Sequence, residues 1–262
     1  MSTADLIEPL NDQAPARNIT LGGLPIAVID RAGEAALIIR LAAQRRPTGP
    51  LFFTSANGEV IARTARDLDL ARLFRAADQI VVDGQPLVLA SHYLCREPLP
   101  ERVATTDLFH DVAKLAEISG TTFYLLGATE LENARAVAAA RSAYPRLRIV
   151  GAAHGYLQGD ALAAKLAEIN ALAPDIVWLG LGVPREQFFF RDHAPELRNV
   201  GMIKTAGGLF DHMAGRTRRA PLFVQRFGFE WLWRAAMEPR RLLWRYLTTN
   251  PRAVYAILRN SR

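Results

Sequence analysis

Residues 80–87 (IVVDGQPL) combine a short apolar run with an acid, a glycine and a proline. The run at 80–82 is typical of a buried strand in a parallel α/β sheet. An acid just past such a strand, here Asp83, lies at the edge where open α/β sheets bind their ligands. Gly84 beside it allows a close approach of the backbone to a ligand. The segment therefore predicts a ligand-binding turn, although a turn that only caps the next helix has the same residues.

Several other loops that follow predicted strands are rich in glycine, amide and hydroxyl residues. Such residues can bind a nucleotide through backbone N–H groups, side-chain amides and helix N-termini. Any single loop of this kind is explained equally well as an ordinary turn, but their repetition favours a nucleotide or nucleotide-sugar site. The residues concerned are Thr54, Ser55, Asn57, Thr105, Thr106, Asp107, Gly127, Gly155, Tyr156, Gly182, Arg185, Glu186 and Gln187. The sequence has neither a Walker loop nor a GxGxxG fingerprint, which argues against an NTPase or a standard dinucleotide dehydrogenase.

The elements that would position these residues alternate along the chain. Strand patterns occur at 21–29, 51–54, 80–82, 122–126, 148–151, 175–181 and 200–204. Helical patterns occur at 31–43, 59–66, 68–76, 87–94, 107–119, 130–143 and 160–172, with Thr106 as the expected N-cap of the fifth. This alternation predicts an α/β fold with a mostly parallel, Rossmann-like sheet flanked by helices.

Composition is that of a soluble globular protein, with 50% hydrophobic and 22% charged residues among 262. That length suffices for one large α/β domain with a small appendage. The single Cys95 excludes a disulfide framework and a CxxC zinc site, which fits a reducing cytosolic setting. No run reaches the about 18 uncharged apolar residues of a spanning helix. Residues 1–17 lack the pattern of a secretory signal and are expected to form a flexible leader.

Positive charge is concentrated in the last segment of the chain. Residues 216–262 contain eleven arginines and two glutamates, a net charge of +9, so the remaining chain carries −3. Trp231, Trp233 and Trp244 are interspersed among these arginines. Arginine with tryptophan and leucine suits the surface of an anionic membrane, and it also suits nucleic-acid phosphates or a plain solvated helix face. We therefore expect an α/β core at 18–215 and a basic, helical, membrane-associating appendage at 216–262.

Eight segments in a fixed order resemble the WecG/TagA/CpsF family of bacterial glycosyltransferases (glycosyltransferase family 26). They are SANGEV, ADQIVVDGQPLVLA, ERVATTDL, FYLLG, GAAHGYL, WLGLGVPREQ, GGLFDHMAGRTRRAP and FEWLWRAAMEPRRLLWRY, and together they span about residues 21–251. The resemblance implies an inverting enzyme that moves a sugar from a UDP-sugar to a polyprenyl-diphosphate-linked saccharide. It also implies a role in exopolysaccharide or cell-surface polysaccharide synthesis.

The resemblance assigns roles to the residues already singled out. Asp83 would be the general base that takes the proton from the acceptor hydroxyl, so that a β-linked product forms from an α-linked UDP-sugar. The polar pair Thr-x-Asn of the family falls on Ser55 and Asn57, or Thr54 supplies the hydroxyl one residue earlier. The other implied substrate contacts are Gly84, Gln85, Asp107, Gly127, Gly155, Tyr156, Gly182, Pro184, Arg185 and Gln187. The chain departs from the family in having Thr106 before Asp107 and in the order Glu186-Gln187, which is inverted.

Arginines of the appendage match family positions that are proposed to meet the diphosphate of donor or acceptor. They are Arg234, Arg241 and Arg245, whereas Arg218, Arg219 and Arg240 are assigned to membrane phosphates or solvent. Guanidinium groups neutralise a leaving diphosphate without a metal, so no metal and no cofactor other than the UDP-sugar substrate is expected. Asp67-Leu68-Asp69 has the DxD spelling but sits in a helical pattern. The five histidines lack metal-ligand spacing, with His154 the one candidate for a further role.

Several points stay open at this stage. UDP-N-acetylmannosamine, its uronic acid and UDP-glucose all suit the family as donors. The resemblance implies a cytoplasmic enzyme bound peripherally to the cytoplasmic face of the inner membrane, and it leaves open whether the enzyme is a homo-oligomer. The competing hypotheses for the function are a non-catalytic nucleotide-sugar scaffold and a nucleic-acid-binding module that uses the arginine-rich tail. The latter leaves the loops at Asp83 and Gly182 unexplained, so nucleic acid is not an expected partner.

Overall fold

The computed structural model describes residues 17–216, 220–221, 224, 230–237 and 239–262, with backbone only at 230–231, 234 and 239–246. The predicted leader therefore lies outside the described residues except for Arg17. Two compact units can be distinguished. The described part of unit 1 comprises residues 32–53 and 105–216, and that of unit 2 comprises 17–31, 54–104 and the described residues after 219. The predicted division at residue 215 stays a prediction.

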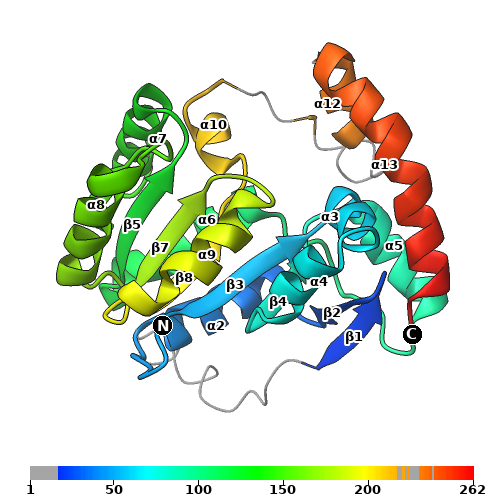
Figure 1. The fold of residues 1–262 in the computed structure, drawn as a ribbon, viewed down its shortest axis with the longest axis horizontal. Helices are drawn as coiled ribbons and strands as arrows, with labels where there is room; N and C mark the ends of the chain where they lie inside the picture. Colours follow the sequence, from blue (N-terminus) through cyan, green and yellow to red (C-terminus); the bar gives the residue numbers. More distant parts are fainter. Residues whose placement is uncertain (1–16, 217–219, 222–223, 225–229, 238) are drawn as a thin grey trace. The chain divides into compact units, whose positions relative to one another are not determined.

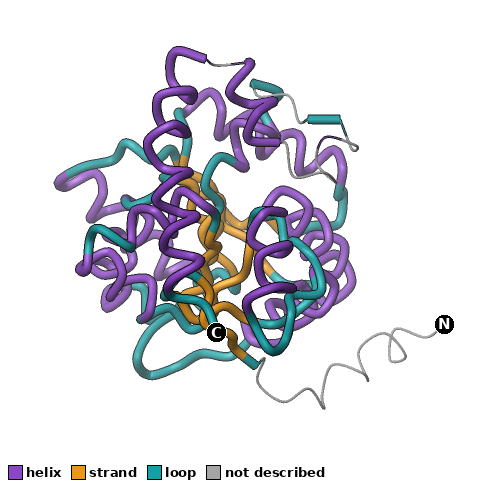
Figure 2. The backbone as a smooth tube through the Cα atoms, turned by 90° about the vertical axis from the view of Figure 1, so that its right-hand side faces the viewer, coloured by secondary structure: helices purple, strands orange, loops and turns teal. Residues whose placement is uncertain are grey.

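A six-stranded parallel sheet, flanked by helices, confirms the expected α/β class (Figures 1 and 2). Its strand order is β4-β3-β8-β7-β5-β6. The strands are β3 (Leu51–Ala56), β4 (Gln79–Val82), β5 (Thr122–Gly127), β6 (Arg148–Ala153), β7 (Ile176–Gly180) and β8 (Met202–Thr205). Strand β7 (IVWLG) is buried along its whole length, as expected for a central parallel strand that is covered on both faces.

The helices of unit 1 alternate with strands along the chain. They are α2 (Arg31–Ala42), α6 (Thr105–Ser119), α7 (Glu130–Ala143), α8 (Gly159–Leu172), α9 (Arg185–His193) and α10 (Leu209–Met213). Its core includes three aromatic rings. Phe109 of α6 lies edge-on to Trp178 of β7, with ring centroids 5.0 Å apart, and Phe123 of β5 is 5.8 Å from Trp178. Helix α6 begins at Thr105, so the prediction that Thr106 is its N-cap is wrong.

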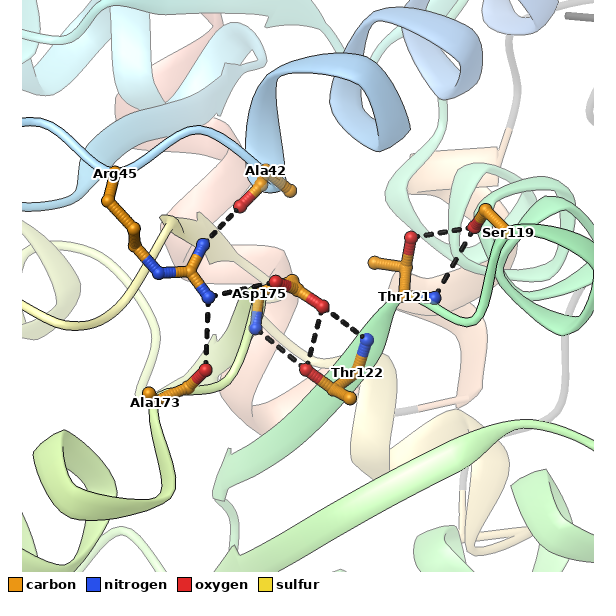
Figure 3. A network of polar contacts seen from close by, with 7 residues as sticks. All are labelled: Ala42, Arg45, Ser119, Thr121, Thr122, Ala173 and Asp175. Carbon is orange, nitrogen blue, oxygen red and sulfur yellow. Dashed lines mark hydrogen bonds and ion pairs between the residues drawn. The ribbon is translucent and has the colours of Figure 1, made fainter.

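A polar clamp joins the amino ends of β5 and β7 in unit 1 (Figure 3). Asp175 accepts hydrogen bonds from the backbone N–H and the hydroxyl of Thr122, both at 2.8 Å, and from Arg45 Nη2 at 2.8 Å. Arg45 also donates to the carbonyls of Ala42 and Ala173. Burial alone would raise the pKa of Asp175, but these donors outweigh it and the pKa is lowered. The clamp stabilises the amino ends of these two strands, which lie opposite the loops that follow their carboxyl ends.

Unit 2 begins with a hairpin of β1 (Asn18–Leu21) and β2 (Leu24–Ala27). The predicted single strand at 21–29 is therefore wrong. Gly22 and Gly23, at φ +59° and +85°, form the tight turn that reverses the chain, because positive φ at both central residues is the geometry of a two-residue hairpin loop.

The helices of unit 2 are α3 (Gly58–Thr64), α4 (Leu68–Arg75), α5 (Gln85–Leu94), α12 (Glu230–Met237) and α13 (Pro239–Arg259). Helix α13 packs against α3 and buries Ala253, Ala256 and Ile257. The residues after α13 pair with the hairpin. Gly23 N–H donates to the Asn260 carbonyl at 2.9 Å, and Gly22 N–H donates to Ser261 Oγ at 3.0 Å.

Candidate functional site

Asp83 and Asn57 are neighbours at the carboxyl ends of β4 and β3, both in unit 2. The backbone N–H of Asp83 donates to the carbonyl of Ala56 at 2.8 Å. A Cβ atom added to Gly84 would lie only 3.8 Å from Asn57 Cβ. The structure thus brings together the acid and the amide that the sequence indicated, 26 residues apart in the chain.

The local backbone argues against a mere capping role for Asp83. The N-cap position of α5 is Gly84, and no side chain caps that helix. Gln85 and Pro86 form the first turn, where the missing N–H of proline costs nothing. The Asp83 carboxylate is half-buried and precedes the cap, so the helix does not require it.

Asn57 has a structural role as well as its predicted one. It is the N-cap of α3, and its Oδ1 accepts the N–H of Val60 at 3.1 Å. Its Nδ2 has no hydrogen-bond partner among the described residues, and the side chain is exposed. Because Oδ1 is held by the helix, the amide N–H₂ is the group that Asn57 can present to a substrate.

The choice between Thr54 and Ser55 follows from strand geometry. Strand β3 extends through Ala56, so Ser55 lies within the strand, as Thr54 was predicted to, and not in the loop expected after residue 54. Thr54 is buried, whereas Ser55 is half-exposed. Asn57 continues the extended backbone, and alternation therefore places Ser55 on the same face as Asn57. This favours Ser55 as the hydroxyl partner of Asn57.

In unit 1, glycines close the carboxyl ends of β5, β6 and β7. A Cβ atom on Gly127 would lie 2.3 Å from the Gly180 carbonyl oxygen, and one on Gly155 would lie 2.4 Å from Leu181 Cδ2. Gly155 N–H donates to the Ala128 carbonyl at 2.9 Å. Close packing thus explains these glycines, and contact with substrate stays a prediction for both. Tyr156, the next residue, is exposed.

Asn133, at the carboxyl ends of β5 and β6, was not predicted from the sequence. Its buried Nδ2 on α7 lies within hydrogen-bond distance of the carbonyls of Leu125, Gly127 and Ala153, at 3.0–3.2 Å. It therefore fastens α7 to the ends of β5 and β6. The available signal was an amide on the helix face that otherwise buries Ala136 and Ala140.

The segment from Gly182 to Gln187 links β7 to α9. Gly182 has φ +75°, which favours glycine, and Pro184 is the N-cap of α9. Arg185 is exposed, but Glu186 and Gln187 are buried. The Glu186 carboxylate accepts the N–H of Leu181 and of Gly207, a second arrangement that sequence reasoning missed. Contact of Gln187 with the donor stays a prediction. Asp107 is half-buried in the first turn of α6.

The appendage arginines are only partly described. Arg234 lies in α12, and Arg241 and Arg245 lie in α13, but their side chains are outside the described atoms. The same holds for the side chain of Arg240, and Arg218 and Arg219 lie wholly outside the described residues. Their predicted phosphate contacts stay predictions.

Other polar groups have structural partners. Asp67 caps α4 by accepting the N–H of Leu70, and Asp69 pairs with Arg72 on the surface. The described residues include no group of three or more acids, cysteines or histidines that could hold a metal ion. Within the described ranges of the chain, no helix combines the length and apolar character needed to cross a bilayer.

Comparison with known proteins gives the class of protein. The model of the glycosyl transferase WecG/TagA/CpsF family matches residues 19–262, and the chain belongs to this family. It is a glycosyltransferase. An N-acetylglucosaminyldiphosphoundecaprenol N-acetyl-beta-D-mannosaminyltransferase of Bacillus spizizenii is 31% identical over 214 residues, 80% of each chain. A Staphylococcus aureus (strain MW2) protein of the same name is 30% identical over 196 residues, 74% of this chain and 75% of that protein.

Proposed function

We propose that this glycosyltransferase moves a sugar from a UDP-sugar to a polyprenyl-diphosphate-linked saccharide, with inversion at the anomeric carbon. The observation that carries the proposal is the proximity of the segment Asp83-Gly84 to Asn57 at the carboxyl ends of β4 and β3. The names of the two relatives support the acceptor class and favour N-acetylmannosamine as the sugar moved. UDP-N-acetylmannosamine is therefore the first donor to test.

In the proposed reaction, Asp83 accepts the proton of the acceptor hydroxyl as its oxygen attacks the anomeric carbon. The new C–O bond forms as the bond to the UDP oxygen breaks, and UDP leaves with the bonding electron pair. The Asn57 amide N–H₂ donates to a sugar oxygen and orients it, since Oδ1 is held by Val60. A carboxylate serving as base must lie within hydrogen-bond reach of the hydroxyl that it deprotonates.

The leaving diphosphate needs positive charge, and we assign it to Arg234, Arg241 and Arg245. The helices that carry them belong to the same compact unit as Asp83. Helix α13 packs on α3, the helix that Asn57 caps. Rigid guanidinium forks suit phosphate oxygens. With arginines in this role the transfer requires no metal.

Helix α13 also supports binding to a membrane surface. Leu247, Pro251, Val254 and Leu258 are exposed and recur at the spacing of one helical face, opposite the buried Ala256. Exposed Arg252 and Arg259 lie together on one side of this apolar stripe, beyond the exposed Tyr255. An apolar face bordered by cations is typical of helices that lie in the interface of an anionic bilayer. We propose that this face docks the enzyme where its lipid-linked acceptor resides.

The test is transfer by purified protein from a panel of UDP-sugars to a short-chain polyprenyl-diphosphate-N-acetylglucosamine, with and without EDTA. The proposal expects a β-linked product from one donor, formed at the same rate in EDTA. UDP binding without transfer to this acceptor would move the search to other acceptor sugars. No binding of UDP or any UDP-sugar would reject the proposal and favour a scaffold.

A further inference from the structure

An acidic and a basic side chain are buried beneath the loops that follow β7 and β8 in unit 1. Glu186, in the first turn of α9, is 1% exposed, and Lys204, in β8, is 0% exposed. The pKa of Glu186 is raised, because the effect of burial exceeds the opposite effect of hydrogen bonds from the backbone of Gly207, Gly182 and Leu181 and of the charge of Lys204. Lys204 Nζ donates to the Thr205 carbonyl at 3.3 Å.

A single carboxylate oxygen connects the two loops. Glu186 Oε1 accepts the N–H of Leu181 at 3.2 Å and the N–H of Gly207 at 2.8 Å. Leu181 and Gly207 follow adjacent strands, which are in register as far as Leu179 and Thr205. Backbone N–H groups in glycine loops at this edge of a sheet commonly bind anionic ligands. Here these two groups point at an internal carboxyl oxygen instead, so they are not available to a phosphate.

We propose that Glu186, balanced by Lys204, is a positioning residue that locks the loop at 181–184 to the loop at 206–208. The locked loop holds the exposed Arg185, the next residue along, in a fixed place for the diphosphate of the donor. This assignment of the ligand rests on the proposed function. The lock itself rests only on the two hydrogen bonds and on the burial of both side chains.

The inverted order Glu186-Gln187 then has a physical reason. A glutamine at 186 would still accept the two N–H groups, but it would remove the negative charge that balances buried Lys204. Buried charges are tolerated when they are paired, and removing one partner costs more than removing both. Glu186 and Lys204 are therefore expected to depend on each other.

The experiment compares Glu186→Gln, Lys204→Met and the double variant with the wild-type enzyme. Asp175→Asn is the matched control, because it breaks a clamp at the opposite ends of β5 and β7 in the same unit. Hydrogen exchange of peptides covering 181–187 and 205–210 should be faster in each single variant and restored in the double variant. In Glu186→Gln the UDP affinity should fall and the donor KM should rise, each about tenfold, with kcat nearly unchanged. Both should recover in the double variant. Asp175→Asn should lower Tm without either effect.

Unchanged exchange in both peptides would overturn the lock. Faster exchange with unchanged UDP affinity and donor KM would overturn the positioning role and leave Glu186 as a structural residue. A wild-type enzyme that binds no UDP would contradict the proposed function, and with it the ligand assigned here. The exchange data would still decide the lock in that case, so the two failures are distinguishable.

Discussion

Thr20 and Arg262 are joined by two backbone hydrogen bonds, 3.2 Å from Thr20 N to Arg262 O and 2.9 Å from Arg262 N to Thr20 O. Together with the bonds from Gly22 and Gly23 to Ser261 and Asn260, they fasten the segment after α13 to the β1–β2 hairpin. The helix that carries the proposed membrane face is thus held at its C-terminal end by the first strands of unit 2.

Deleting residues 260–262 should release this end of α13. The four hydrogen bonds to the hairpin are lost, at a net cost of about 2–6 kcal/mol of unfolding free energy. Urea unfolding and hydrogen exchange of 247–259 provide the measurement. Ser261→Ala is the control, since it removes the bond from Gly22 and the bond from Ser261 Oγ to the Ile257 carbonyl but leaves the other three bonds to the hairpin. It should cost about 1–2 kcal/mol. Equal protection of α13 in the deletion variant would show that packing on α3 is sufficient.

Asp83→Asn should lower kcat by about 10²–10⁴-fold, because the amide cannot take the hydroxyl proton. Tm should stay within a degree or two of wild type, since Asp83 does not cap α5. Asp69→Asn, on the exposed surface of α4, is the control and should leave kcat unchanged. Full transfer activity in Asp83→Asn would remove Asp83 from the role of base.

Two variants of Asn57 separate its capping role from its catalytic role. Asn57→Asp keeps an oxygen that accepts the Val60 N–H but loses the amide donor, so stability should be retained and activity lost. Asn57→Ala should lose activity and also about 1 kcal/mol of stability, because the cap is gone. Thermal unfolding and kcat/KM are the readouts. An active Asn57→Asp enzyme would confine this residue to capping.

The clamp at Asp175 predicts a pH dependence of stability. Its pKa in the folded protein is lowered from the ordinary value of 3.8. The stabilisation is therefore fully present above that ordinary value and is lost as pH falls through the lower, folded pKa. Asp175→Asn should be less stable than wild type at pH 7 by about 1–3 kcal/mol, and the difference should shrink below pH 3.8. Urea titrations across this range measure it, and a difference independent of pH would contradict the role of the charge.

Replacing Leu247, Val254 and Leu258 by serine should weaken binding to anionic vesicles, since each loses apolar area from the proposed membrane face. Cosedimentation with vesicles of anionic or neutral lipid is the measurement. Leu131→Ser, an equally exposed leucine on α7, is the control. Unchanged binding of the triple variant would exclude this face of α13.

Local patterns predicted much of this molecule. Helix α7 occupies residues 130–143 as its periodicity indicated, and Asp83 follows directly after the buried strand β4. These features depend on which neighbouring residues are buried, and the order of apolar and polar side chains along the segment indicates this. The hairpin at 18–27 was missed because its two short strands and their glycines also read as one bent strand.

The sequence by itself determined the alternation of strands and helices, the family, and the residue types of the candidate site. Only the tertiary structure decided which of these residues meet. The proximity of Asn57 to Gly84, the burial of Glu186 with Lys204 and the pairing of Thr20 with Arg262 each join residues from separate elements. Such contacts depend on how whole elements pack, and no periodicity within a single segment encodes them.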